Sequence, residues 1–291
     1  MDTARYRAFV EAVDKGSLSQ AAKTLNYTPS GVSQLISALE RDLGFPLLER
    51  TKHGVRLTKT GETLLPVVRA IVQEEERLKE MSSEINGLTI GSVTIGSYPS
   101  VATHWLPKVI KAFHEHYPKI EIRVMEGIHQ EIDDWLSTYQ VDLAFMSQAP
   151  NSPYEWIPLG TDSMVAVLSL DHPLANAEYY PIERVEEEAF IMPGLGHDID
   201  TMHVLEKYDL KPHVVIETIE NASMLAMVEQ GMGMSVVNSL LTKKLNFDIA
   251  LVPIQPENSI IFGLAIQSLQ DASPAVRRFV EYAIDQLNQL T

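Results

Sequence analysis

Residues 17–40, which read SLSQAAKTLNYTPSGVSQLISALE, constrain the fold more than any other stretch of the chain. Ser17 and Gln20 have the Ser-x-x-Gln spacing of a capping box, which favours a helix start. After a short turn, Thr28 is suited to an N-cap and Pro29 to the first helical position, where its missing N–H costs nothing. The stretch therefore predicts two short helices joined by a tight turn.

The second of these helices has two different faces. Apolar residues at helical spacing form the inward face, which consists of Val32, Ile36, Leu39 and Leu43. The other face is short, uncharged and rich in hydrogen-bonding groups, and consists of Ser30, Ser33, Gln34 and Ser37. This pattern fits a helix-turn-helix whose second helix enters the major groove and bonds to base edges. Taken alone, the polar face would favour an ordinary solvated helix.

The segment PLLERTKHGVRLT, residues 46–58, predicts two short strands around a turn at His53 and Gly54. A hairpin behind the second helix is typical of a wing, which places cations against phosphates or in the minor groove. Without this context its basic residues would be an ordinary solvated surface. The residues predicted to contact double-stranded promoter DNA are Thr28, Pro29, Ser30, Ser33, Gln34, Ser37, Arg50, Lys52 and Arg56.

The charge of the chain is unevenly distributed. Residues 1–60 hold nine basic and six acidic residues, a net charge of +3, whereas the whole chain carries −16, which leaves −19 for residues 61–291. Phosphate would repel such an acidic body. The distribution therefore indicates that only the N-terminal head meets a polyanion.

Composition and missing motifs exclude several classes of protein. The chain has no cysteine, which excludes disulfides, thiolate metal sites and cysteine nucleophiles, and is compatible with the predicted cytoplasmic location. We find no signal-peptide pattern and no apolar run near the roughly 20 residues of a membrane span. The chain also lacks a Gly-x-Ser-x-Gly elbow and a phosphate-binding loop, so we do not expect an enzyme.

The stretch AFVEAVDKGSLSQAAKTLNYTPSGVSQLISALERDLGFPLLERTKHGVRLTKTGETLLP resembles the N-terminal signature of LysR-type transcriptional regulators nearly position for position. The resemblance implies a winged helix-turn-helix over residues 1–58, with RNA polymerase as a further partner if the protein is an activator. The family usually has Gln and Ala where this chain has Pro29 and Gly31. The operator preference of other members therefore does not carry over.

Residues 59–87 predict one long linker helix. Seven positions in it are alternately four and three residues apart and five of them are apolar, which is typical of a coiled-coil seam. The resemblance implies that this helix pairs with a second copy of the chain in a homodimer or homotetramer; a helix packed on its own body is the alternative. The predicted dimerisation residues are Leu64, Val68, Ile71, Leu78 and Ile85.

Strand-like and helical segments alternate over residues 88–291, among them a helical pattern at 101–118. This alternation predicts an α/β fold with parallel sheets covered by helices on both sides. The segments LPKVIKAFHEHYPKIEIRVMEG, VDLAFM, DHPLA and VEQGMGMSVV resemble the LysR effector domain. The resemblance implies a periplasmic-binding-protein-like fold with a small-molecule effector between two lobes. Lobe I is expected over about 88–160 and 267–291, and lobe II over about 161–266.

Ligands of open α/β sheets bind beyond the carboxyl ends of strands, beside helix N-termini. On this basis the predicted effector contacts are Ser97, Ser100 and Val101 after the first body strand, and Gly127, Ile128 and His129 after the second. The resemblance adds Met146, Gln148, Pro193, Gly194 and Asn221. Ser100 is explained as well by a plain N-cap. Since none of these residues is Lys or Arg, a small neutral compound or monoanion is favoured over a dianion.

Four neighbouring side chains belong to types that bind metals, namely His197, Asp198, Asp200 and His203. Their spacing matches no standard ligand pattern. We therefore predict no metal and no cofactor, and a small-molecule effector as the bound compound.

Overall fold

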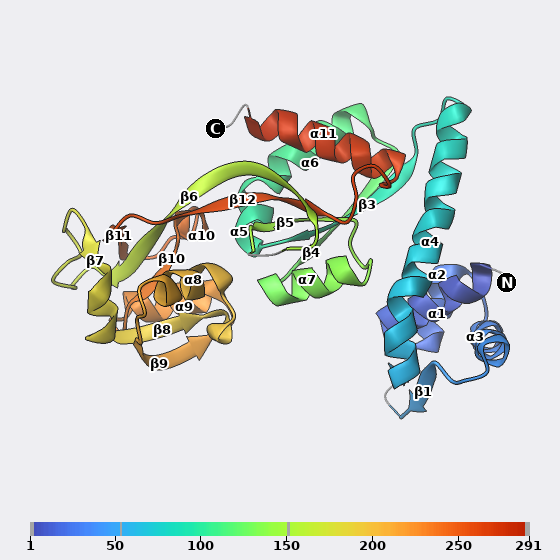
Figure 1. Cartoon of the computed structure of the whole chain (residues 1–291), viewed down its shortest axis with the longest axis horizontal. Coiled ribbons are helices and arrows are strands. Elements are labelled where there is room, and N and C mark those ends of the chain that lie inside the picture. Colours follow the sequence, from blue (N-terminus) through green and yellow to red (C-terminus); the bar gives the residue numbers. More distant parts are fainter. Residues whose placement is uncertain (1–2, 53, 150–151, 289–291) are drawn as a thin grey trace.

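The computed structural model describes residues 3–52, 54–149 and 152–288. A helical head, a long helix and a two-lobed body follow one another in space (Figure 1). The long helix α4 (Lys59–Ile85) lies between the head and the body. Within the described residues, no helix is both long and apolar enough to cross a membrane.

The head contains α1 (Thr3–Lys15), α2 (Leu18–Leu25) and α3 (Pro29–Leu43). Helices α2 and α3 begin where the sequence predicts them. Ser17 Oγ accepts a hydrogen bond from the Gln20 N–H at 3.4 Å, and Thr28 Oγ1 accepts one from the Gly31 N–H at 3.1 Å. The core of the head includes three of the four predicted inward residues of α3, which are Val32, Ile36 and Leu39.

A hairpin follows α3, in which β1 (Leu48–Thr51) pairs antiparallel with β2 (Gly54–Leu57). His53, predicted at its turn, lies outside the described residues. The Val55 N–H donates to the Gly16 carbonyl at 3.0 Å, which fixes the hairpin on the turn between α1 and α2. Gly54 has φ 132°, and a Cβ there would lie only 2.1 Å from the same oxygen. This position therefore requires glycine.

Helix α4 runs without a break from the head to the body. Thr58 caps it, because its Oγ1 accepts a hydrogen bond from the Gly61 N–H at 3.0 Å. Val68 packs in the core of the head, and Arg69 forms an ion pair with Asp14 of α1. The N-terminal half of α4 is thus part of the head.

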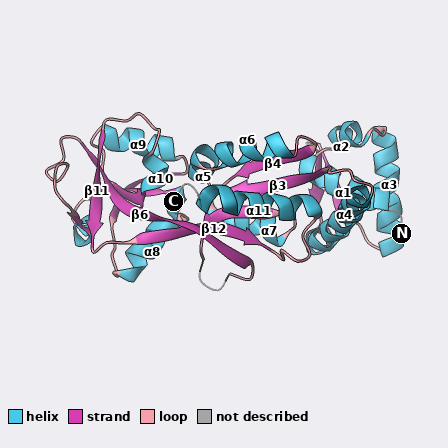
Figure 2. Cartoon of the chain, turned by 90° about the horizontal axis from the view of Figure 1, so that it is seen from above, coloured by secondary structure: helices cyan, strands magenta, loops and turns pink. Residues whose placement is uncertain are grey.

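The elements of lobe I are β3 (Gly91–Ser97), α5 (Pro99–His104), α6 (Leu106–His116), β4 (Ile120–Glu126), α7 (His129–Ser137), β5 (Leu143–Ser147) and α11 (Pro274–Asn288). Strand β3 is parallel to both of its neighbours, β4 and β5, as predicted. Helices α6 and α11 lie together over one face of the strands (Figure 2), and α7 covers the other face (Figure 1).

The single helix predicted over 101–118 is two helices in the structure. The break falls at Trp105, between α5 and α6. Pro107 explains it, because proline has no N–H to donate to the carbonyl of Thr103. That carbonyl instead accepts from Lys244 Nζ at 3.4 Å.

Two strands, β6 (Glu155–Ser169) and β12 (Ser259–Ile266), connect the lobes. Strand β12 is antiparallel to both β5 and β6, so the expectation of parallel sheets alone is wrong here. The register of the β12–β6 pair shifts between Phe262 and Gly263. A Cβ on Gly263 would lie 2.5 Å from the Ile157 carbonyl, so glycine permits this close strand contact.

The lobe boundaries differ from those expected at about residues 160 and 266. Residues 262–266 pair with β5 and so belong to the sheet of lobe I. Strand β6 pairs with β12 up to Ser163 and with β10 and β11 from Met164 onward, so one strand serves both lobes. Periodicity locates a strand but does not indicate its partners, which explains the difference.

Lobe II contains β7 (Tyr180–Pro181), β8 (Ala189–Pro193), α8 (Ile199–Lys207), β9 (His213–Thr218), α9 (Asn221–Glu229), β10 (Ser235–Asn238), α10 (Ser239–Thr242) and β11 (Ile249–Gln255), with short 3-10 turns at 182–186 and 194–196. Strands β8 and β9 are parallel, and a bridge from Phe190 to Met234 joins β8 to the chain just before β10. The N-termini of α8 and α9 face lobe I.

Candidate functional site

The polar face of α3 points toward solvent. Its exposed residues are Thr28, Pro29, Ser30, Gln34 and Ser37, while Ser33 is half-buried. Thr28 also caps the helix, and its hydroxyl lies 3.1 Å from the Ser30 hydroxyl. The face therefore offers amide and hydroxyl groups to a large partner.

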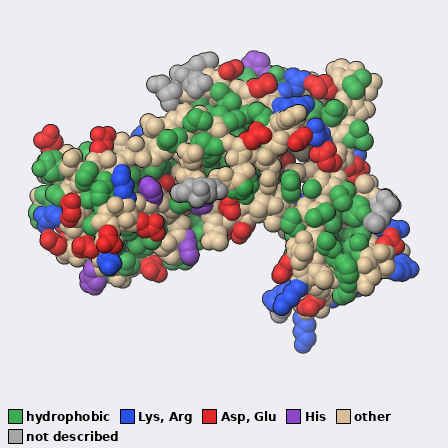
Figure 3. Space-filling view, viewed as in Figure 1, with side chains coloured by type: hydrophobic (Ala, Val, Ile, Leu, Met, Phe, Trp, Pro, Cys, Tyr) green, Lys and Arg blue, Asp and Glu red, His purple; other side chains and the backbone are tan. Residues whose placement is uncertain are grey.

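The hairpin is bonded to α3 through Arg50. Its Nη2 donates to Ser33 Oγ at 2.6 Å, a contact that the sequence did not indicate. Lys52 and Arg56 are exposed on the same hairpin. Figure 3 shows Lys and Arg side chains gathered at the tip of the head, whereas acidic side chains are spread over the body. The tip of the head is thus the positive end of the molecule.

The predicted dimerisation residues divide into two groups. Ile71, Leu78 and Ile85 are 38%, 67% and 85% exposed. Val68, only 5% exposed, is buried in the core of the head, so its prediction is wrong, whereas Leu64 is half-buried against that core and its dimer contact stays a prediction. Two further apolar residues of α4, Val67 and Met81, are exposed and form one exposed row with Ile71, Leu78 and Ile85. Val67 precedes Ile71 by four residues and Met81 follows Leu78 by three, and this spacing could have identified both residues from the sequence.

A cavity of about 60 Å³ lies between the lobes. Lobe I contributes the starts of α5 and α7, and lobe II contributes the starts of α8 and α9. A wider groove of about 470 Å³ shares part of this lining, including Ser100, Ile128 and Asn221. The predicted effector residues that line the cavity are Ser100, Gly127, Ile128, His129, Gly194 and Asn221.

The other predicted effector residues lie outside this cavity. Ser97 is buried and donates its hydroxyl to the Tyr98 carbonyl at 2.9 Å, and Val101 is buried in the core of lobe I. Pro193 is buried at the end of β8. Met146 lines a separate hollow beside His129, and Gln148 is exposed. Strands β5 and β8 and the end of β3 are buried at consecutive positions, because both faces of these strands are covered, so Ser97, Met146 and Pro193 do not reach this cavity.

Tyr98 is a cavity residue that the sequence reasoning missed. Its hydroxyl lies 2.8 Å from His129 Nδ1 and 3.0 Å from Ser147 Oγ. Burial, reinforced by the charge of Asp200, raises the pKa of Tyr98 well above its ordinary value. Burial also lowers the pKa of His129. Both groups are therefore neutral near pH 7 and act as hydrogen-bonding groups.

Two carboxylates at the start of α8 also line the cavity. Asp198 caps the helix, since its Oδ1 accepts from the Thr201 N–H at 2.9 Å. Asp200 is 6% exposed, and burial, followed by the charge of Asp198, raises its pKa to about 7. In the sequence, both residues stood out only as candidate metal ligands. Within the described residues, no three or more acidic or histidine side chains are grouped to hold a metal ion.

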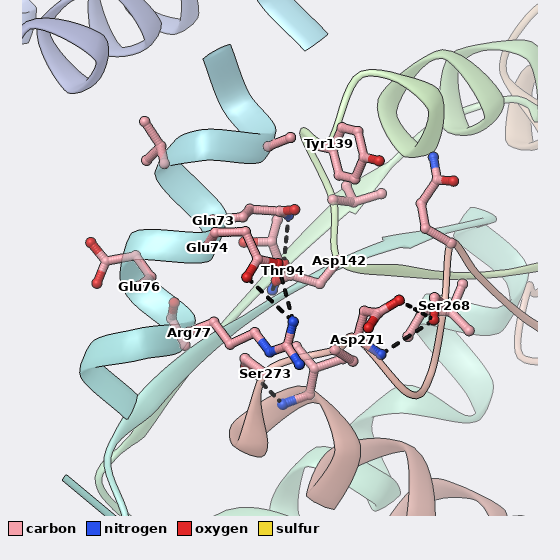
Figure 4. A pocket seen from close by; sticks show the side chains of 18 of the residues that line it. Gln73, Glu74, Glu76, Arg77, Thr94, Tyr139, Asp142, Ser268, Asp271 and Ser273 are labelled. Atoms are coloured by element: carbon pink, nitrogen blue, oxygen red, sulfur yellow. Dashed lines mark hydrogen bonds and ion pairs between the residues drawn. The ribbon is translucent and has the colours of Figure 1, made fainter. Parts of the chain in front are cut away.

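A second hollow, of about 630 Å³, lies between α4 and lobe I (Figure 4). On its wall Gln73 Nε2 donates to Asp142 Oδ1 at 3.0 Å, and the Thr94 N–H donates to Oδ2 at 2.7 Å. Burial raises the pKa of Asp142 to about 6. Glu80 of α4 accepts from the N–H groups of Ser92 and Ala275, at 3.2 and 3.1 Å. These bonds hold the C-terminal half of α4 on lobe I.

Family models match both parts of the chain. The model described as "Bacterial regulatory helix-turn-helix protein, lysR family" matches residues 3–62, and "LysR substrate binding domain" matches residues 86–288. The chain belongs to the LysR family. It is a LysR-type transcriptional regulator, with a DNA-binding head and an effector-binding body, and the family consists of regulators and not of enzymes.

Known proteins resemble this regulator over nearly its whole length or over its body. The uncharacterized HTH-type transcriptional regulator YvbU of Bacillus subtilis (strain 168) is 28% identical over 286 residues, which are 97% of this chain and 98% of YvbU. A full-length OxyR variant of Pseudomonas aeruginosa has a TM-score of 0.80 at 19% identity, and the match covers 99% of this chain and 95% of the OxyR chain. The CcmR regulatory domain of Synechocystis PCC6803, in complex with 2-PG, has a TM-score of 0.63 at 20% identity, and the match covers 69% of this chain and 99% of the CcmR domain.

Proposed function

We propose that α3 and the hairpin read one operator sequence, and that an effector in the cavity between the lobes controls the result. The support for base reading is the exposed, uncharged face of α3 beside exposed cations. Gln34 and Ser37 are suited to base edges, whereas Lys52 and Arg56 are suited to phosphates.

The cavity is the observation that carries the effector part of the proposal. It is lined by both lobes, with groups that bind small polar molecules. A regulatory domain of the same fold, that of CcmR, is in complex with 2-PG. Because α4 is bonded to lobe I through Asp142 and Glu80, a change in lobe arrangement has a direct mechanical connection to the head.

The exposed row on α4 supports a homodimer as the active unit, or a homotetramer with further contacts of the body. A dimer presents two α3 helices to two half-sites. The regulator would act in the cytoplasm, where its DNA is, and RNA polymerase would be its further partner at a promoter that it activates. We propose no cofactor besides the effector.

The test of this function uses Ser100, which lines both the cavity and the groove. Duplexes selected from a random library first supply the operator. A footprint is then recorded with and without the small-molecule fraction of a host-cell extract, for the wild type, Ser100→Phe and the control Ser137→Phe. Ser137 is an exposed serine at the end of α7.

The extract should alter the footprint of the wild type and of Ser137→Phe, but not that of Ser100→Phe. All three proteins should bind the operator equally without extract, because the head has its own core. An equal response of Ser100→Phe would place the effector elsewhere. Failure to select any preferred duplex would contradict the reading role of α3.

A further inference from the structure

Resting on the proposed effector role of the interlobe cavity, we propose that the effector carries a protonated amine or guanidinium group, which binds at Asp198 and Asp200. The first argument is the charge of the lining. Both carboxylates face the cavity, and the described lining residues include no Lys or Arg. An anionic group placed there would meet two acids at low dielectric, whereas a cationic group would be attracted by both.

The second argument is how Asp200 is bonded. Glu80 and Asp200 are equally buried, both 6% exposed, yet Glu80 accepts from two backbone N–H groups. Asp142 likewise accepts from the Gln73 amide and the Thr94 N–H. The Ser147 hydroxyl is near enough to Asp200 to lower its pKa, but within the described part of the chain the Asp200 carboxylate accepts no hydrogen bond as short as those of Glu80 and Asp142.

This Ser147 hydroxyl is also shared, because it lies 3.0 Å from the Tyr98 hydroxyl. A hydroxyl supplies one proton, so Asp200 receives at most one hydrogen bond from it. A buried carboxylate with so few donors is unfavourable unless it stays protonated or gains a partner. Burial, followed by the charge of Asp198, raises the pKa of Asp200 to about 7, as this penalty requires. An incoming cation with N–H groups supplies both the missing donors and the missing charge.

The third argument concerns size. A water-sized group needs roughly 15 Å³ of cavity volume, so the cavity of about 60 Å³ can hold only a few non-hydrogen atoms of a ligand. An ammonium or guanidinium head fits this space, and the remainder of the molecule would lie in the adjoining groove of about 470 Å³. The lining of that groove has both signs of charge, with one lysine, Lys243, and three acids, Glu126, Glu131 and Glu220. The effector is therefore a small organic compound with a terminal cationic group.

The experiment measures thermal unfolding and calorimetric binding of the full chain at pH 7.5 with matched probes. The amine set is n-butylamine, 1,4-diaminobutane and agmatine, and the matched set is 1-butanol, butyrate and succinate. The variants are Asp200→Asn and Asp198→Asn. The amide of Asp198→Asn keeps an oxygen that can accept from the Thr201 N–H. Asp171→Asn, at an exposed position, is the control.

At least one amine or guanidine should raise the unfolding temperature of the wild type and of Asp171→Asn. Asp200→Asn and Asp198→Asn should each weaken its binding at least tenfold. The matched alcohol and acids should give no shift. If no amine or guanidine binds, or if binding is unchanged in both cavity variants, the inference is overturned.

Ser100→Phe separates this inference from the proposed function. Binding of a carboxylate that Ser100→Phe abolishes would keep the cavity as the effector site and overturn the cationic class. Binding of an amine that persists in Ser100→Phe and in both Asp variants would overturn both the class and the site.

Discussion

The face of α3 and the cavity between the lobes are both made of small polar side chains, but their surroundings differ. Gln34 and Ser37 are exposed, whereas Asp200 of the cavity and the neighbouring Ser147 are buried. A polar group in water exchanges its hydrogen bonds at little cost, while a buried one depends on each partner. Substitutions on the head should therefore change binding alone, and those in the cavity should change binding and stability together.

The largest expected effect tests whether the exposed α3 face of a single head is sufficient for operator binding. Leu78→Glu combined with Ile85→Glu places two charges in the exposed row of α4. Loss of two apolar contacts of about 1.5 kcal/mol each should lower operator affinity about 100-fold or more. Light scattering should show monomers. Leu251→Glu, at an exposed position in lobe II, is the matched control, and monomers that bind the operator normally would contradict the prediction.

The second prediction addresses stability in the cavity. An unfolded aspartate loses its proton near pH 4, whereas folded Asp200 keeps it to about pH 7. Stability therefore falls as pH rises between these values, and the cost is complete above pH 7. Asp200→Asn should raise the free energy of unfolding of the body by roughly 1 to 3 kcal/mol at pH 8, and by less at pH 5. Denaturant unfolding at both pH values measures this, and an equal gain at both would refute the stated origin.

The third prediction is the counterpart on the head. Gln34→Ala should cost about 1 to 3 kcal/mol of affinity on the selected operator and little on random DNA. Its unfolding temperature should equal that of the wild type, because Gln34 is exposed. Titrating the variant, the wild type and the body control Gln270→Ala with the selected operator and with a random duplex measures these affinities. Equal weakening on both duplexes would remove Gln34 from the reading of bases.

The smallest effect concerns a single cation. Lys52→Ala should weaken all sequences similarly and reduce the slope of log affinity against log salt by roughly one unit. Binding measured at several salt concentrations gives the slope. A change confined to the selected operator would mean that Lys52 contacts a base instead of a phosphate.

The head could be predicted almost completely from sequence because its signals are local. Ser17 and Thr28 cap the helices predicted from them, and the apolar spacing of α3 gives its buried face. What sequence did not give depends on distant pairing. The Arg50–Ser33 bond joins residues 17 apart, and Val68 is buried only because the head folds onto α4.

The cavity was only half predictable for the same reason. Residues that follow strands in lobe I, such as Ser100 and Ile128, were found from the general rule for α/β sheets. Asp200 and Asn238 come from lobe II, and they lie at the cavity because β6 and β12 run from one lobe into the other. No short-range sequence pattern indicates this connection between the lobes, so the acidic character of the cavity could not be derived beforehand.

Glu80 shows where the functional modules of the chain meet. This residue of α4 supplies acceptors for Ser92 at the start of β3 and for Ala275 at the start of α11. An effector domain excised at residue 86 would leave both N–H groups without this acceptor. A chimaera that exchanges heads between regulators should therefore be joined before Gln73, so that the second half of α4 is inherited together with the body whose fold it completes.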